Sequence, residues 1–174
     1  VQEEVGYTEE KGRKVFKPDG TYQKIAAVER HKNTGKIGVG IVKGFGLRGG
    51  AIASSVSHDS HNLIVIGDND HDMYLAVQEL LRTQGGYTLV ENGQVFDTLP
   101  LPIMGLMSDA GYEKVNEKLA RMIPKAHEMG IPEGFDPFIT LSFMALPVIP
   151  EIRITPRGVY LTQEDRMIQS PFDR

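Results

Sequence analysis

Apolar and polar positions along the first half of the chain predict two pairs of strands. The apolar runs that start at Ile25 and Ile37 are separated by K-N-T-G, and two such runs joined by a short Asn/Gly turn predict a β-hairpin. Small and β-branched residues between 49 and 56 predict a central strand, and the apolar run at 63–66 predicts the strand that follows it. The first half of the chain is therefore expected to be rich in β-structure.

A helix is predicted after the Asp/Asn cluster at 68–70, because apolar residues recur there at helical spacing until the paired glycines at 85–86. The run at 87–90 predicts the next strand, and E-N-G-Q at 91–94 predicts a hairpin that leads into 95–99. Strand, helix and strand form a βαβ unit, whose two strands are expected to run parallel.

A longer amphipathic pattern predicts a second helix over residues 111–129. Ser108 or Asp109 is expected to cap this helix. Pro124 is expected to kink or split it, because proline lacks the N–H group of the helical hydrogen bond. This part of the chain is therefore expected to be helical, with one irregularity.

The most apolar segment, residues 136–149, begins with Asp-Pro, which fits an N-cap residue followed by proline in the first helical turn. A short buried helix is therefore predicted to about residue 145. A last short strand is expected within residues 152–161, before the chain becomes polar.

Together, these elements predict an α+β fold: a mixed sheet with hairpins and one βαβ crossover, and helices packed on the sheet. This domain is expected to occupy residues 24–161. Residues 1–23 are charged and rich in turn formers, so an extended lead-in segment is expected before the domain. Residues 162–174 are expected to form a polar tail.

Composition narrows the classes of partner. The 174 residues fit one domain, and the hydrophobic fraction of 40% is typical of a globular protein. The net charge of −4, without a long basic run, argues against nucleic acid as a partner. No window approaches the roughly 18 apolar residues of a membrane span, so no membrane association is expected. The first residue is Val1 instead of Met, which indicates a trimmed leader or tag, or a piece of a longer protein.

Cysteine is absent from the chain. This absence removes disulfides, thiolate metal sites and a cysteine nucleophile. It also suits a reducing compartment, so a cytoplasmic location is expected.

Six polar side chains follow one another between the strands predicted at 49–56 and 63–66. They are Ser57, His58, Asp59, Ser60, His61 and Asn62. Polar groups between two core strands are costly to desolvate unless a partner satisfies them. The cluster is therefore either a functional site or a network in which side chains bond the backbone and stabilise a turn.

The motif H-D-S-H places His58 and His61 three residues apart, which makes them weak candidates for metal ligands, with Asp59 as an oxygen ligand or an orienting group. Further candidates for oxygen and nitrogen ligands follow at Asp68, Asp70, His71 and Asp72. Such a set suits Mn(II), Zn(II) or Fe(II). The signal is weak because H-x-x-H is not the helical H-E-x-x-H motif of zinc proteases.

Two neighbouring features leave alternatives open. A serine triad built from Ser54, Ser55 or Ser57 with the adjacent His and Asp is disfavoured, because adjacent strand residues point to opposite faces and G-x-S-x-G is missing. The charged residues 29–31, at the end of the first strand, are either a surface cluster or a polar lining beside the polar cluster at 57–62.

Four segments carry a resemblance to a known family. They are K-G-F-G-L-R-G-G-A-I-A-S-S-V-S-H-D-S-H-N-L-I-V-I-G-D-N-D-H-D-M at 43–73, E-R-H-K-N-T-G-K-I-G-V-G at 29–40, L-P-L-P-I-M-G-L-M-S-D at 99–109, and D-P-F-I-T-L-S-F-M-A-L-P-V-I-P-E-I-R-I-T at 136–155. Together they span about residues 24–161. The chain resembles the C-terminal domain of adenine deaminase, in the amidohydrolase superfamily.

The resemblance implies a hydrolase that converts adenine and water to hypoxanthine and ammonia. Enzymes of this family use Mn(II) or Fe(II) to generate the attacking hydroxide, and the metal is bound mainly by a (β/α)8 barrel that contains an H-x-H motif. This chain has neither that motif nor room for the barrel. The chain alone is therefore expected to be incomplete and inactive. Its implied partners are the N-terminal metal-binding barrel portion of the same enzyme, adenine, and further copies in a homo-oligomer.

The resemblance also gives the polar cluster a possible role. His58, Asp59 and His61 become candidates for a proton relay or a lid over the active site, and the candidate substrate-binding residues are Ser54, Ser55, Ser57 and Asn62. The alternatives are a non-catalytic module that binds a purine or a metal, and an oligomerisation module.

Overall fold

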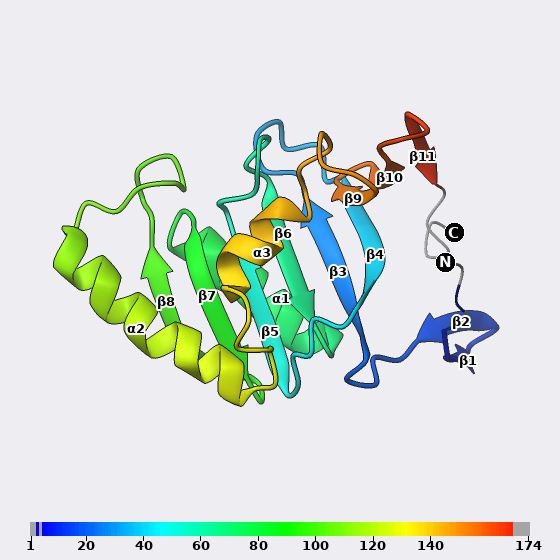
Figure 1. Ribbon diagram of the computed structural model, residues 1–174, viewed down its shortest axis with the longest axis horizontal. Helices are drawn as coiled ribbons and strands as arrows, with labels where there is room; N and C mark the ends of the chain where they lie inside the picture. Colours follow the sequence, from blue (N-terminus) through cyan, green and yellow to red (C-terminus); the bar gives the residue numbers. More distant parts are fainter. Residues whose placement is uncertain (1–2, 4, 169–174) are drawn as a thin grey trace.

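A six-stranded sheet forms the centre of the molecule (Figure 1). The computed structural model describes residues 3 and 5–168. The strand order across the sheet is β4-β3-β6-β5-β7-β8. Its strands are β3 (Tyr22–Val28), β4 (Ile37–Lys43), β5 (Gly50–Ser54), β6 (Leu63–Gly67), β7 (Gly86–Glu91) and β8 (Gln94–Pro100). All six were anticipated by the hydrophobic pattern.

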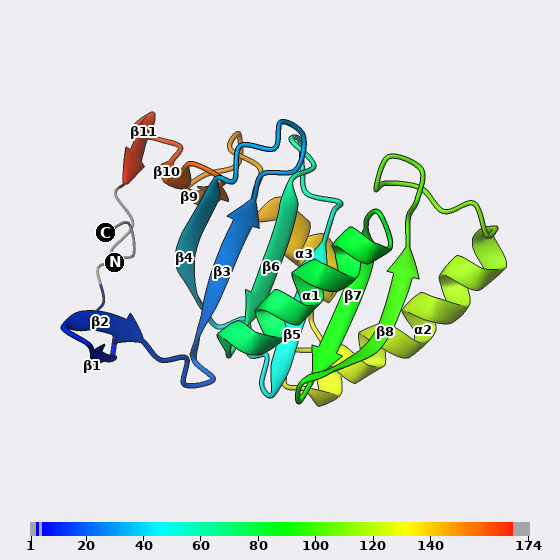
Figure 2. The ribbon, with the colours of Figure 1, turned by 180° about the vertical axis from the view of Figure 1, so that it is seen from behind.

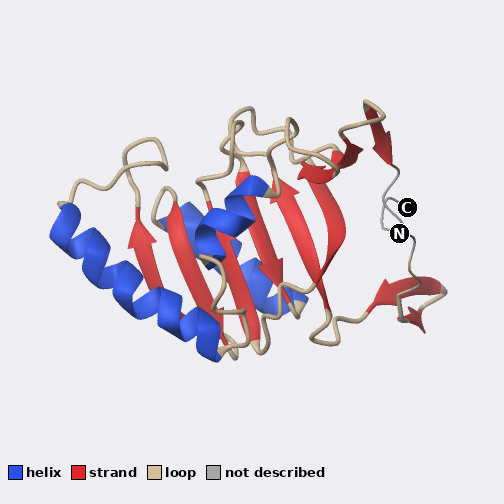
Figure 3. Ribbon diagram, viewed as in Figure 1, coloured by secondary structure: helices blue, strands red, loops and turns tan. Residues whose placement is uncertain are grey.

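Helices cover both faces of this sheet. The helices α2 (Tyr112–Glu128) and α3 (Pro137–Phe143) lie on one face, and α1 (Asp70–Arg82) lies on the other (Figures 1 and 2). Strands and helices are thus separate layers, as the colouring by secondary structure shows (Figure 3). The predicted α+β class is confirmed.

The predicted βαβ unit is β6, α1 and β7. The two strands run parallel as expected, but β5 lies between them and pairs antiparallel with both: Ile52 is opposite Ile66 on one side and Leu89 on the other. Every ladder between the described strands is consequently antiparallel, so the expected mixed sheet contains no direct parallel pairing. The physical reason is that the loop at 55–62 returns the chain directly beside β5, and α1 must then cross over β5.

Smaller sheets flank the central one. The lead-in segment contains a hairpin of β1 (Tyr7–Glu10) and β2 (Arg13–Phe16). The last predicted strand is a hairpin of β9 (Ile152–Thr155) and β10 (Gly158–Leu161), to which β11 (Arg166–Ile168) adds a third strand. The end of the predicted polar tail, 169–174, lies outside the described residues.

Local capping explains where two of the helices begin. Asn69 caps α1, and its side chain accepts a hydrogen bond from the Asp72 backbone N–H at 2.8 Å. Asp136 caps α3 by accepting from the backbone N–H groups of Phe138 and Ile139, both at 2.9 Å. The Asp136 cap was predicted from the Asp-Pro pair, whereas the sequence placed the start of α1 only at the cluster 68–70.

The start of α2 differs from the prediction. Gly111, with φ 84°, occupies the N-cap position, and no side chain caps this helix. Ser108 instead accepts a hydrogen bond from the Ala110 backbone N–H at 3.1 Å, in the turn before the helix. Pro124 lies within one continuous helical element, so it does not split α2.

The sheet separates two apolar cores. Ile52, Ile66 and Leu89 face α2 and α3 and are fully buried there. On the other face, Ala51 and Ala53 are small enough for α1 to pack closely on β5. Burial of a large aliphatic side chain contributes roughly 1.5–3 kcal/mol, so these two layers hold the sheet and helices together. No helix in the described part of the chain is long and apolar enough to cross a bilayer.

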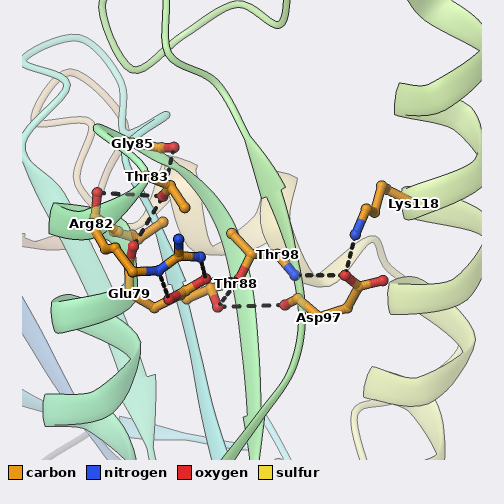
Figure 4. A network of polar contacts seen from close by, with 9 residues as sticks. Glu79, Arg82, Thr83, Gly85, Thr88, Asp97, Thr98 and Lys118 are labelled. Atoms are coloured by element: carbon orange, nitrogen blue, oxygen red, sulfur yellow. Dashed lines mark hydrogen bonds and ion pairs between the residues drawn. The ribbon is translucent and has the colours of Figure 1, made fainter. Parts of the chain in front are cut away.

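A polar network fixes the edge strand β8 between two helices (Figure 4). Thr98 bonds Glu79 of α1 at 3.0 Å and Thr88 of β7 at 2.9 Å. Its backbone N–H donates to the carboxylate of Asp97 at 2.8 Å, and Asp97 also accepts from Lys118 of α2. The network spans the sheet edge from one helical layer to the other.

Candidate functional site

One end of the sheet gathers four loops (Figure 1). They are residues 29–36 after β3, residues 55–62 after β5, residues 101–111 after β8, and residues 144–151 after α3. We call this end the His58 edge. It holds all six residues of the polar cluster, so the structure brings that cluster together with loops that are distant in the sequence.

The two histidines of the cluster lie side by side. The His58 ring centroid is 5.8 Å from that of His61 and 5.2 Å from that of Phe143, at the end of α3. The loop is tightly turned, because the His61 backbone N–H donates to the carbonyl oxygen of Ser57 at 2.6 Å. His58 and His61 are half-buried, whereas Asp59 is exposed. The imidazole pair therefore lies at the surface of a tight, hydrogen-bonded turn.

The first two candidate serines, Ser54 and Ser55, use their hydroxyl groups to bond the backbone. Ser54 and Ser55 are fully buried. The Ser54 hydroxyl donates to the Val56 carbonyl at 3.0 Å. The Ser55 hydroxyl donates to the Gly105 carbonyl at 2.6 Å and accepts from the Gly86 N–H at 2.8 Å. Their hydroxyl groups thus satisfy neighbouring backbone groups, as expected if these serines belong to a network that stabilises a turn instead of a substrate site.

The other two candidates line a small cavity. Ser57 and Asn62 lie there with Ser60, against apolar side chains, around a volume of about 120 Å³. The Asn62 side chain accepts a hydrogen bond from the backbone N–H of Arg30 at 3.2 Å and donates one to the Ser60 hydroxyl at 3.0 Å. The Ser57 hydroxyl is buried and has no partner among the described residues. Ligand pockets usually measure roughly 300–1,000 Å³, so a purine needs space outside this cavity.

The charged residues at 29–31 do lie beside the cluster. Arg30 donates to the carbonyl oxygen of His61 at 2.6 Å, and His31 bonds the carbonyl oxygen of Ser60 through Nε2 at 2.6 Å. The sequence left open whether these residues form a surface cluster or a polar lining. Both side chains contact the loop that carries the cluster, with His31 exposed and Arg30 half-buried.

Glu29 organises the loop that carries these residues. Its carboxylate accepts from the backbone N–H groups of His31, Lys32 and Thr34 at 2.6, 2.7 and 3.0 Å. These bonds, the one from Thr34 first, lower the pKa of Glu29 to about 2. The loop therefore stays bonded to an ionised carboxylate at neutral pH.

Electrostatics favour a neutral His61. Burial lowers the pKa of the His61 imidazole, and the neighbouring His58 and Arg30 lower it further, while Asp59 acts in the opposite direction. The Nδ1 atom of His61 is buried and has no hydrogen-bond partner among the described residues. A neutral imidazole offers one donor and one acceptor, which suits contact with a neutral base or transfer of a proton.

The remaining candidate metal ligands lie at the opposite end of the sheet. Strand β6 separates the two groups by roughly 16 Å, since each strand residue rises about 3.3 Å. There Asp68 accepts from the Gly49 and Gly50 N–H groups at 2.5 and 3.0 Å, and Asp72 accepts from the Gly93 N–H at 2.9 Å. These carboxylates hold turns in place.

No group of three or more His, Cys, Asp or Glu side chains among the described residues is arranged to hold a metal ion. His58 and His61 would therefore contribute at most two ligands, and a protein metal centre generally needs three or more. The residues present at this edge do not fit a Mn(II) or Fe(II) centre of their own.

Two contributors to the edge could not be found from the sequence. The turn at 103–107 reaches the cluster through Arg30, which donates to the Met104 carbonyl oxygen at 2.6 Å across 74 positions. Phe143 reaches it through the ring of His58. The positive φ of Gly105, +74°, marks a tight turn, but no sequence signal indicates its partner.

The comparisons with known proteins give the class of this domain. A family model described as the adenine deaminase C-terminal domain matches residues 2–166, and the chain belongs to that family.

Individual relatives of this chain are named adenine deaminase. The chain is 58% identical over 154 residues to the adenine deaminase of Desulfitobacterium hafniense, covering 88% of this chain and 27% of the relative. It is 54% identical over 146 residues to the adenine deaminase of Nitratidesulfovibrio vulgaris, covering 83% and 25%. It is 49% identical over 147 residues to that of Bacillus subtilis, covering 83% and 26%. The chain thus spans about a quarter of the length of these relatives.

Proposed function

We propose that this chain acts as the C-terminal part of an enzyme that hydrolyses adenine to hypoxanthine and ammonia. The observation that carries the proposal is the match to relatives named adenine deaminase, at 58% identity over 88% of the chain. The chain spans only 27% of that relative, so the reaction is assigned to the assembled enzyme and not to this domain alone.

The His58 edge is the surface that we assign to the active site. His58 and His61 lie there on a hydrogen-bonded turn, and binding residues favour turns that a scaffold positions. In its neutral form, His61 can accept a proton from one group and donate one to another, as a relay to departing ammonia requires. The apolar Phe143 beside His58 would help to exclude water when the edge is covered.

The metal belongs to the remainder of the enzyme in this proposal. A Mn(II) or Fe(II) ion supplies a nucleophilic hydroxide when bound. The described residues of this chain do not assemble three ligands, so we assign the metal to a barrel portion outside the chain. The role left to this domain is to close the site, to orient the base and to carry protons.

The reaction can be tested by reconstitution. Adenine deamination is measured with Mn(II) for the chain alone, for the part of the Desulfitobacterium hafniense relative outside the matched segment, for their mixture, and for a chimera in which this chain replaces that segment. We expect activity from the mixture or the chimera and from neither part alone.

Either of two results would contradict the proposal. Activity of the chain alone would show that the metal site is complete here. Inactivity of a folded, metal-loaded chimera would favour a module that binds without chemistry, or one that only joins subunits.

A further inference from the structure

Arg30 links three segments of the His58 edge. Its Nε donates to the carbonyl oxygen of His61 at 2.6 Å, and its Nη2 donates to that of Met104 at 2.6 Å. Its backbone N–H donates to the side chain of Asn62 at 3.2 Å. One residue after β3 therefore fixes both the loop after β5 and the turn after β8.

The turn at 103–107 is shaped to receive this guanidinium. A Cβ added at Gly105 would lie 2.3 Å from Nη1 of Arg30, closer than real Cβ contacts allow. The carbonyl oxygen of Gly105 accepts from the buried hydroxyl of Ser55 at 2.6 Å, which anchors the turn to the end of β5. The guanidinium thus packs closely against a turn that a second hydrogen bond, from Ser55, also holds.

The charge of Arg30 faces carbonyl oxygens and imidazoles. Its two guanidinium bonds go to backbone oxygens, and burial lowers the pKa of the Arg30 guanidinium. The titratable and charged groups that face His61 are His58 and Asp59 from its own loop and Arg30 and His31 from the loop after β3. The turn at 103–107 carries no ionisable residue. Arg30 is therefore the permanent cation of this group.

We propose that Arg30 is a positioning residue for the reaction, which holds the His58–His61 turn in its active orientation through its forked hydrogen bonds to His61 and Met104. This inference rests on the proposed function of the His58 edge. A second effect follows from the same placement: the fixed positive charge disfavours protonation of His61 and so keeps its imidazole available as an acceptor. Lysine at this position would retain the charge but lose the planar fork.

The charge effect can be measured on the chain itself. Ring chemical shifts of His61 are followed by NMR against pH in the unaltered chain, in Arg30→Met, in Arg30→Lys and in Arg48→Met. Arg48 is an exposed arginine at the opposite end of the sheet and serves as the matched control. We expect the pKa of His61 to rise in Arg30→Met, to stay close to its original value in Arg30→Lys, and to be unchanged in Arg48→Met.

The positioning effect is measured in the chimeric enzyme. We expect kcat to fall about tenfold to a hundredfold for both Arg30→Met and Arg30→Lys, with a smaller change in KM, because small displacements of a catalytic group can cost about a hundredfold in rate. The Arg48→Met chimera should retain full kcat.

The two arms separate failure of this inference from failure of the proposed function. An unchanged pKa of His61 in a folded Arg30→Met chain overturns the charge effect, and full kcat in the Arg30→Lys chimera overturns the positioning role. An inactive chimera with an unaltered domain contradicts the proposed function, and the NMR titration then still decides whether Arg30 controls His61.

Discussion

Substitution of Ser55 can distinguish a structural role from a substrate-binding role for this residue of the His58 edge. Replacing it by alanine removes a hydroxyl that accepts from the Gly86 N–H and donates to the Gly105 carbonyl, at 2.8 and 2.6 Å. Ser55 is fully buried, so water cannot replace the hydroxyl without a rearrangement. An unpaired buried group costs roughly 1–3 kcal/mol, and two of them give an expected loss of about 2–6 kcal/mol in the free energy of unfolding.

Urea unfolding of the chain, followed by circular dichroism, measures this loss. Ser60→Ala is the matched control, because Ser60 is exposed and accepts one hydrogen bond, from Asn62 at 3.0 Å. We expect it to cost less than about 1 kcal/mol. A loss below about 0.5 kcal/mol for Ser55→Ala, within the range of neutral surface changes, would refute the structural role. An increase in the KM of the chimera for adenine at unchanged stability would then favour substrate binding.

Three further predictions concern other parts of the domain. The pKa of Glu29 is about 2 in the folded chain against 4.5 ordinarily, so the stabilisation of its loop is present above pH 4.5 and is lost as the pH falls through about 2. The amide resonance of Thr34, followed by NMR against pH, should show this transition with a midpoint near pH 2. A midpoint near pH 4.5 would contradict the prediction. Met122→Ala removes a fully buried side chain of α2 and should lower the free energy of unfolding by about 2–5 kcal/mol in urea titrations, whereas a loss below about 1 kcal/mol would show that the core collapses into the space. Asp136→Ala removes the cap of α3 and should lower the free energy of unfolding by about 0.5–2 kcal/mol, with Glu133→Ala, an exposed carboxylate before the helix, as a near-neutral control. Equal losses in these two carboxylate variants would refute the capping role of Asp136.

Local sequence signals account for most of the elements. The hairpin around K-N-T-G, the helix start at the cluster 68–70 and the Asp-Pro start of α3 each depend on neighbouring residues, and each is confirmed. The insertion of β5 between β6 and β7 depends on which strands pair, which no local pattern encodes. The start of α2 at Gly111 likewise follows the geometry of the preceding turn, which prevailed over the propensity of Ser108 and Asp109 to cap.

In the candidate site too, local groupings could be predicted from the sequence, whereas contacts between distant residues could not. Residues 57–62 are contiguous, so their gathering at one loop could be predicted. The neighbours Met104 and Phe143 could not, because contact across many positions is decided by tertiary packing. Conversely, Asp68 follows the cluster closely in sequence, but one intervening strand carries it to the other end of the sheet.

The turnover of the chimeric enzyme after His58→Ala and His61→Ala tests the assignment of the His58 edge most directly. His71→Ala is the control, because His71 is an exposed histidine of α1 at the opposite end of the sheet. If the edge serves the reaction, kcat/KM should fall by roughly a hundredfold in the double variant, as loss of a proton-transfer group does, with unchanged thermal stability and full activity in the control. Normal turnover in the double variant would contradict the assignment and leave the domain a structural role.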